Sequence, residues 1–290
     1  MTGPRCAEVA DAAGDAREGT APPAERWFLI EHPGPWGRVA FAESGLPDAV
    51  VAAADRWAGA HGGRVLLVRR PGRRPRRAGS RRWFRVDSRP GRESVRTGTV
   101  VHDDELVTAL DDPGQPHDAL HLVCAHGRHD TCCAVRGRPV AAALAAADPD
   151  RTWECSHVGG CRFAPALVLL PHGFVYGGMP AVDAVTLVKD HAAGLVDPRW
   201  LRGRSSLPPA VQAAQHHARS ATGELGVDAL RPVGLTSNGT RWRVELAGPG
   251  CVVELDERFV DAGRPLTCAA VTPGRMRVLD LVSLRVAGRC

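Results

Sequence analysis

Cysteine and histidine residues that can bind a metal gather in one short part of the sequence. Five of the nine cysteines lie between positions 124 and 161. Cys124 and Cys133 are separated by eight residues in CAHGRHDTCC, and His157 and Cys161 by three in SHVGGC. Thiolate and imidazole groups are preferred ligands of zinc, copper and iron–sulfur clusters. The odd number of cysteines argues against a secreted disulfide framework, so the pattern predicts metal or redox chemistry in a reducing compartment.

Two further cysteines close to these pairs leave the choice of ligands open. Cys132 adjoins Cys133, and adjacent residues point in different directions, so we expect only one of the two to bind. Cys155 stands two residues before His157 and is the second choice in place of Cys161.

Other cysteines and histidines have simpler interpretations. His126 and His129 follow Cys124 on the same loop, and we expect them to cap the loop or support the ligands rather than bind. Four isolated cysteines are expected to be buried apolar residues or inert tail thiols. They are Cys6, Cys251, Cys268 and Cys290.

Each of the two pairs follows a segment whose sequence pattern is typical of a β-strand. Residues 120–124 (LHLVC) form an apolar strand that ends at Cys124, and residues 153–156 form a strand directly before His157. Loops at strand ends can surround a cofactor because their backbone is not used in a ladder. Three glycines in these loops allow a close backbone approach. They are Gly127, Gly159 and Gly160.

Strands and helices alternate through the first 200 residues, which predicts an α/β fold. Further expected strands are 26–31, 64–68, 166–170 and 174–176. The expected helices are 47–60, 134–147 (with Pro139 near its start) and 183–193. Beyond residue 194, a helix at 208–221 and strands at 241–246, 251–255, 266–271 and 276–286 predict a small antiparallel β appendage. No internal repeat is visible in the sequence.

Composition and charge exclude several classes of protein. The formal net charge is +5, and every basic residue except Lys189 is arginine. A single Tyr and six Phe offer few rings for base stacking, which argues against nucleic acid as a partner. Because the sequence has no membrane-length apolar run and no apolar secretory stretch near its start, we expect a cytoplasmic protein without membrane association. Residues 1–25 are rich in Ala, Gly, Pro and charge, and we expect a disordered lead-in.

Three long motifs resemble the sucrase/ferredoxin-like family: FLIEHPGPWG, CAHGRHDTCCAVRGRP and WECSHVGGCRFAPALVLLPHGFVYGG, with RGRSSLPPAVQAA at the end of the similarity. The resemblance implies a thioredoxin-like [2Fe–2S] ferredoxin domain, which we place at 116–205. It would be preceded by a small α/β segment at 26–115 and followed by a helix and the β appendage at 206–290. The family pattern implies that Cys124, Cys133, His157 and the residue at 161 hold the cluster.

The sequence departs from the family pattern at position 161. Many relatives are expected to have histidine there, in SHxGGH, whereas this chain has Cys161, which predicts a Cys₃His site. Replacing a thiolate by a neutral imidazole removes one negative charge, so one histidine should raise the potential part of the way towards Rieske centres. The outer nitrogen of His157 could also couple reduction to proton uptake.

The leading interpretation is a non-catalytic electron carrier that serves a redox partner protein, either a reductase or an acceptor. A basic loop at 69–85 could dock an acidic partner, although solvated loops of this composition are common. The alternative is a structural zinc protein, since Cys₃His also suits tetrahedral zinc. A thiol oxidoreductase would need a Cys-x-x-Cys pair, and sucrose hydrolysis would need a carboxylate pair that the sequence does not reveal.

Overall fold

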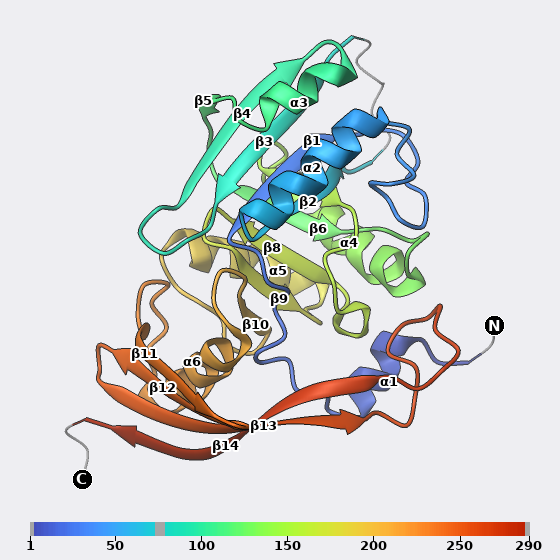
Figure 1. Ribbon diagram of the computed structural model, residues 1–290. Helices are drawn as coiled ribbons and strands as arrows, with labels where there is room; N and C mark the ends of the chain where they lie inside the picture. Colours follow the sequence, from blue (N-terminus) through green and yellow to red (C-terminus); the bar gives the residue numbers. More distant parts are fainter. Residues whose placement is uncertain (1–2, 73–78, 288–290) are drawn as a thin grey trace.

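Ten strands form one mixed sheet in the order β10-β9-β8-β6-β7-β2-β1-β3-β4-β5, and four more form a separate antiparallel sheet (Figure 1). This computed structural model describes residues 3–72 and 79–287. The strands of the large sheet are β1 (Arg26–Glu31), β2 (Gly63–Arg69), β3 (Arg81–Asp87), β4 (Ser94–Val100), β5 (Gln115–Pro116), β6 (Leu120–Cys124), β7 (Thr152–Cys155), β8 (Ala166–Leu170), β9 (Phe174–Gly177) and β10 (Leu201–Arg204). The helices are α1 (Cys6–Ala12), α2 (Asp48–Ala60), α3 (Leu106–Ala109), α4 (Thr131–Ala147), α5 (Ala181–Ala192) and α6 (Pro209–Thr222), with 3-10 turns η1 (Asp103–Glu105) and η2 (Cys161–Phe163).

The large sheet contains the same strand arrangement twice, although no repeat is visible in the sequence. In the first half, β1 and β2 are parallel and joined through α2, β3 is antiparallel to β1, and β4 is antiparallel to β3. In the second half, β6 and β7 are parallel and joined through α4, β8 is antiparallel to β6, and β9 is antiparallel to β8. Each half then adds a helix, α3 or α5, and a fifth, antiparallel strand, β5 or β10. The halves meet where β2 pairs antiparallel with β7.

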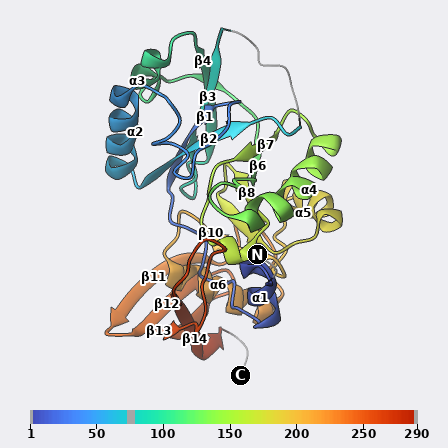
Figure 2. The same ribbon diagram turned by 90° about the vertical axis from the view of Figure 1, so that its right-hand side faces the viewer.

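Alternating residues divide the core between the two faces of this sheet. On β1, Trp27 and Leu29 face one way and Phe28 and Ile30 the other, as the period of two in a strand requires. On one face, the apolar core is continuous through both halves of the sheet. The other is covered separately by α2 and α3 in the first half and by α4 and α5 in the second. Figure 2 shows these two helix pairs as separate groups.

The small sheet has the order β11 (Arg231–Asn238), β12 (Arg241–Ala247), β13 (Cys251–Asp261) and β14 (Arg275–Val286). Helix α6 lies between it and the large sheet, with its alanine-rich face buried against β12, β13 and β14 (Figure 1). The expected antiparallel β appendage is therefore confirmed. The expected strand at 266–271 is wrong, because these residues belong to the loop between β13 and β14.

The expectation of a disordered lead-in is corrected by the N-terminal segment. Residues 6–12 form α1, and the small side chains of Cys6, Ala7 and Ala10 are buried. Ala21 and Ala24, farther along, are also buried in the core of the large sheet. Small residues can cover a sheet face closely, but they carry little of the apolar signal that predicts a helix.

Helix α4 also begins earlier than expected. Asp130 is its N-cap, and its carboxylate accepts a hydrogen bond from the backbone N–H of Cys132 at 2.8 Å. Pro139 consequently lies inside the helix rather than near its start. The proline leaves the carbonyl of Val135 without its helical partner, and Val135 is exposed, so water can satisfy that carbonyl.

Candidate metal centre

The four predicted ligands converge at one edge of the second half. Cys124 is the last residue of β6, and His157 follows the end of β7. Because β6 and β7 are parallel, their carboxyl ends meet at the same edge, where open α/β sheets commonly bind ligands. Cys133 lies in the first turn of α4, and Cys161 begins η2. The elements therefore bring residues 37 positions apart into one site.

The donor atoms lie close enough to share a metal group. The donors of Cys124, Cys133 and His157 all lie within 4.8 Å of one another. Cys161 Sγ is 3.5 Å from His157 Nδ1. The three thiols are almost fully buried, and His157 is half-buried. The structure thus brings all four predicted residues together, while their role as ligands stays a prediction.

Before any cofactor is considered, contacts among these side chains favour the thiolate at two cysteines, whereas hydrogen bonds to Cys124 and Cys161 raise the pKa of Cys133. A hydrogen bond from Cys133, aided by His157, holds the pKa of Cys124 well below its usual range. The same two neighbours lower the pKa of Cys161. Burial alone would lower the pKa of His157, but its contacts with Cys124 and Cys161 outweigh burial and raise it to about 9. Two thiols are therefore prepared to act as anionic ligands.

A buried arginine supplies positive charge behind the site. Arg202 is only 2% exposed, and it donates to the carbonyls of Gly159 at 2.9 Å and Thr20 at 2.5 Å. Among the described residues no carboxylate forms an ion pair with it. Burial and the charge of Arg162 lower its pKa to about 9, while the negative sulfur atoms of the site oppose that shift. A buried cation without a carboxylate needs anionic neighbours, and the thiolates provide them.

The second glycine of SHVGGC is required by this arginine. Gly160 has a φ of +73°, a left-handed conformation that suits glycine. A Cβ at this position would collide with the guanidinium of Arg202. Sequence reasoning missed Arg202, although it begins the motif RGRSSLPPAVQAA, because nothing in that motif indicates a buried cation.

Two histidines on the loop after β6 support the site. His126 accepts the backbone N–H of His157 through Nδ1 at 3.3 Å, so its Nε2–H donates to the Gly37 carbonyl at 2.6 Å. His129 stacks on His157 with ring centres 3.6 Å apart, and its Nδ1–H donates to the Arg38 carbonyl. His126 thus has the supporting role expected of it. His129 also lies within 4.8 Å of the donors of His157 and Cys161, closer to a ligand position than expected.

The alternative cysteines face elsewhere. Cys155 is fully buried in β7, and it belongs to none of the metal-capable groups of the described residues. Cys132 points towards Cys6 and Cys268, away from its neighbour Cys133. The interpretation of Cys6 and Cys268 as isolated thiols is therefore wrong. Cys251 is a buried core residue, and Cys290 lies outside the described residues.

The expected basic docking loop is only partly described, since residues 73–78 lie outside the described ranges. The arginines at its start have partners within the molecule. Arg69 pairs with Glu154 at 2.8 Å and lies over the Trp36 ring. Arg70 lies over Trp153 and donates to the Asp150 carbonyl. These two side chains therefore brace the seam between β2 and β7.

One of three comparisons with known proteins finds a match, which is to a protein family. In the part of the chain that the structure describes, no helix combines the length and apolar character needed to cross a membrane. Comparison with curated proteins and with solved structures gave no significant match. A family model described as Sucrase/ferredoxin-like matches residues 18–203, well over half of the chain, and this range includes all four predicted ligands. The chain therefore belongs to the sucrase/ferredoxin-like family.

Proposed function

We propose that Cys124, Cys133, His157 and Cys161 hold a [2Fe–2S] cluster and that the protein is an electron carrier. The observation that carries this proposal is the meeting of four soft donors at one edge of the sheet, with the buried Arg202 bonded to the loop between His157 and Cys161. An oxidised [2Fe–2S] cluster with three thiolate ligands bears net negative charge, which a buried guanidinium can balance. When bound, such a cluster accepts and releases one electron at a time.

The spread of the donors favours a cluster over a single ion. Cys124, Cys133 and His157 form one metal-capable group. Cys161 lies within 4.8 Å of His157 in a second group and of Cys133 in a third, but among the described residues it shares no group with Cys124. A cluster with two irons needs two pairs of ligands, one pair for each iron. A single tetrahedral ion needs all four donors in one group.

The arrangement of the second half supports a thioredoxin-like domain. The strand order β7-β6-β8-β9, with α4 between the parallel strands and α5 after the hairpin, agrees with the fold that the family resemblance implies. The helix-covered face and the site at the strand ends are consistent with that assignment.

His157 and His129 give the site its most accessible side. Both rings are partly exposed and stacked, whereas the three thiols are buried. We propose that electrons pass through these imidazoles to a redox partner protein. Arg38 and Arg128 are exposed beside them, so an acidic patch on the partner would be complementary. The eight described cysteines are free thiols, which fits a reducing, cytoplasmic location.

The second candidate is a structural zinc ion at the same residues. Its support is that the donors of Cys124, Cys133 and His157 lie within 4.8 Å of one another, close enough for three ligands of one ion. Analysis of anaerobically purified protein separates the two. A [2Fe–2S] protein should hold two irons and two acid-labile sulfides per chain, absorb in the visible and give an EPR signal when reduced. Colourless protein that retains zinc at these residues after reconstitution with iron and sulfide would exclude the cluster.

A further inference from the structure

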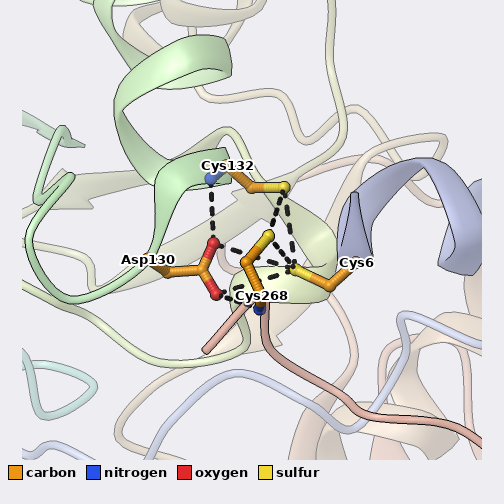
Figure 3. Close-up of side chains that lie close together, drawn as sticks. All are labelled: Cys6, Asp130, Cys132 and Cys268. Atoms are coloured by element: carbon orange, nitrogen blue, oxygen red, sulfur yellow. Dashed lines mark hydrogen bonds between the residues drawn. The ribbon is translucent and has the colours of Figure 1, made fainter. Parts of the chain in front are cut away.

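Three cysteines from distant parts of the chain meet at a second site. Figure 3 shows the side chains of Cys6, Cys132 and Cys268 pointing towards one another beside the carboxylate of Asp130. Cys6 begins α1, Cys132 lies in the first turn of α4, and Cys268 lies on the loop between β13 and β14. These residues are 126 or more positions apart in the chain, so the fold alone brings them together.

The sulfur atoms form a nearly equilateral triangle. The Sγ–Sγ distances are 3.6 Å for Cys6–Cys132, 3.4 Å for Cys132–Cys268 and 3.5 Å for Cys268–Cys6. In a tetrahedral zinc site with Zn–S bonds of about 2.3 Å, neighbouring sulfurs lie about 3.8 Å apart. The triangle is within a few tenths of an ångström of that geometry, and a zinc ion would sit just above its plane.

The carboxylate of Asp130 occupies the place of a fourth ligand. Its oxygens lie 3.7 and 3.8 Å from Cys6 Sγ, and all four donors fall within 4.8 Å of one another. The backbone N–H groups of Cys132 and Cys268 donate to its two oxygens, each at 2.8 Å. These hydrogen bonds fix the orientation of the carboxylate, as is usual for metal-binding carboxylates.

Asp130 also lacks the cation that a buried carboxylate requires. It is only 2% exposed, and among the described residues no basic side chain forms an ion pair with it. Arg162 and Arg264 approach this region but both pair with Asp15 instead. A bound divalent ion would supply the missing positive charge.

Other chemistries fit the three thiols less well. A disulfide between two of them would leave the third thiol unused and would need an S–S distance of about 2.05 Å. An iron–sulfur cluster needs donors spread over more than one iron, whereas these four donors form a single compact group. A mononuclear thiophilic ion uses every donor present.

We propose that Cys6, Cys132, Cys268 and Asp130 bind one zinc ion as a structural site separate from the cluster site. The ion would join α1, the start of α4 and the loop between the last two strands. A cavity of about 630 Å³ borders Cys6 and Cys268 and provides a path for the metal. Asp130 also lies within 4.8 Å of Cys133 and Cys161, so the two sites adjoin at this residue without sharing a cysteine.

Metal analysis of the full chain, purified anaerobically from zinc-supplemented medium, tests the proposal. The wild type should hold one zinc per chain, and Cys268→Ser should lower the zinc content at least about tenfold while leaving iron and sulfide unchanged. Cys268 lies on a loop outside both sheets, so this variant is expected to fold. Cys6→Ser should give the same loss, and Cys251→Ser, a buried cysteine outside both sites, should keep its zinc.

Several results would overturn the zinc site. They are a wild type that binds no zinc when Zn²⁺ is added, zinc that is retained in Cys268→Ser but lost in Cys133→Ser, and a disulfide among the three thiols in non-reducing mass spectrometry of freshly purified protein. The proposed cluster is tested separately by iron and sulfide. If the wild type held two zinc ions and no iron, and Cys268→Ser lost one of them, the cluster would be excluded and the second site would stand.

Discussion

The two halves of the large sheet share a framework but differ in the loops that leave it. After β1, the first half has HPGPWGRVAFAESGLP, which contains no cysteine, before α2 begins. After β6, the second half has a short loop that leads from Cys124 to Cys133 in the first turn of α4. The strands are equivalent in order and direction, so the framework does not determine the chemistry. The chemistry comes from residues at the strand ends, as in many folds with varied functions.

The first half nevertheless contributes to the site in the second. Its long loop reaches across the seam, where the carbonyls of Gly37 and Arg38 accept hydrogen bonds from His126 and His129. Trp36 on this loop lies edge-on to His126. Under the proposed function, the second half would bind the cofactor and this loop of the first half would enclose it.

The largest effects should follow from removing a ligand in the second half. Cys133→Ser and Cys161→Ser should abolish cluster binding, because serine is a poor ligand for a soft metal site. The iron and sulfide content of anaerobically purified protein measures this. Cys155→Ala is the matched control and should retain both, since Cys155 is buried outside the metal-capable groups. If Cys155→Ala lost its iron and Cys161→Ser kept it, the ligand set would be wrong at that position.

The next effect concerns the charge of the ligand at 157. His157→Cys adds a negative charge beside the irons, so the added electron is disfavoured and the midpoint potential should fall, on the order of 100 mV. Cys161→His should shift it in the opposite direction. Redox titration of the three proteins measures both shifts. An unchanged potential in His157→Cys with an intact cluster would show that His157 is not a ligand.

The same titrations across pH test proton coupling. If the outer nitrogen of His157 gains a proton on reduction, the wild-type potential should fall as pH rises, by up to about 59 mV per unit. His157→Cys should be flat in the same range. A wild-type potential that does not change with pH would leave His157 as a ligand but exclude coupled proton uptake.

The sequence predicted the strands and the donor pairs because both depend on local patterns. LHLVC is an apolar run that ends at Cys124, and the predicted strand 120–124 coincides with β6. Adjacent residues on an element point apart, so only one of Cys132 and Cys133 was expected to bind, and the family spacing favoured Cys133. These inferences needed only neighbouring residues and known spacing.

Features that depend on long-range packing could not be predicted in this way. The structural repeat has no counterpart in the sequence, because the two halves preserve strand order rather than side chains. Cys6 and Cys268 looked isolated since their partners lie more than 120 positions away. The segment 266–271 resembled a strand, yet the N–H of Cys268 bonds to Asp130 instead of to a neighbouring strand.

Acid should destabilise the second half through two buried histidines. Burial lowers the pKa of His191 to about 3 and that of His121 to about 4. Both histidines are neutral in the folded protein. Below pH 6.5 the unfolded chain therefore binds more protons than the folded protein does. The stability that is present above pH 6.5 is lost as the pH falls. Each histidine should lower the free energy of unfolding by about 2 kcal/mol between pH 7 and pH 5. Urea unfolding at the two pH values should show that His191→Phe loses about 2 kcal/mol less unfolding free energy than the wild type does. An equal loss in the two proteins would contradict this assignment.

The smallest predicted effect tests whether the first half does enclose the site. Trp36 is 4% exposed, and its indole N–H donates to the His32 carbonyl at 3.2 Å, which holds the loop after β1 in place. Trp36→Phe removes this hydrogen bond and leaves a buried carbonyl unpaired, at a cost of about 1 kcal/mol. If the cluster is lost through opening of this loop, iron release to a chelator should be about fivefold faster, with an unchanged potential.

Trp27→Phe is the matched control, because the Trp27 ring is equally buried but its N–H has no acceptor among the described residues. That change costs no hydrogen bond and lies in the sheet rather than in the loop, so it should leave the rate of iron release unaltered. Equal release rates in the two variants would mean that the loop does not limit access, and the second half would then protect its cofactor alone.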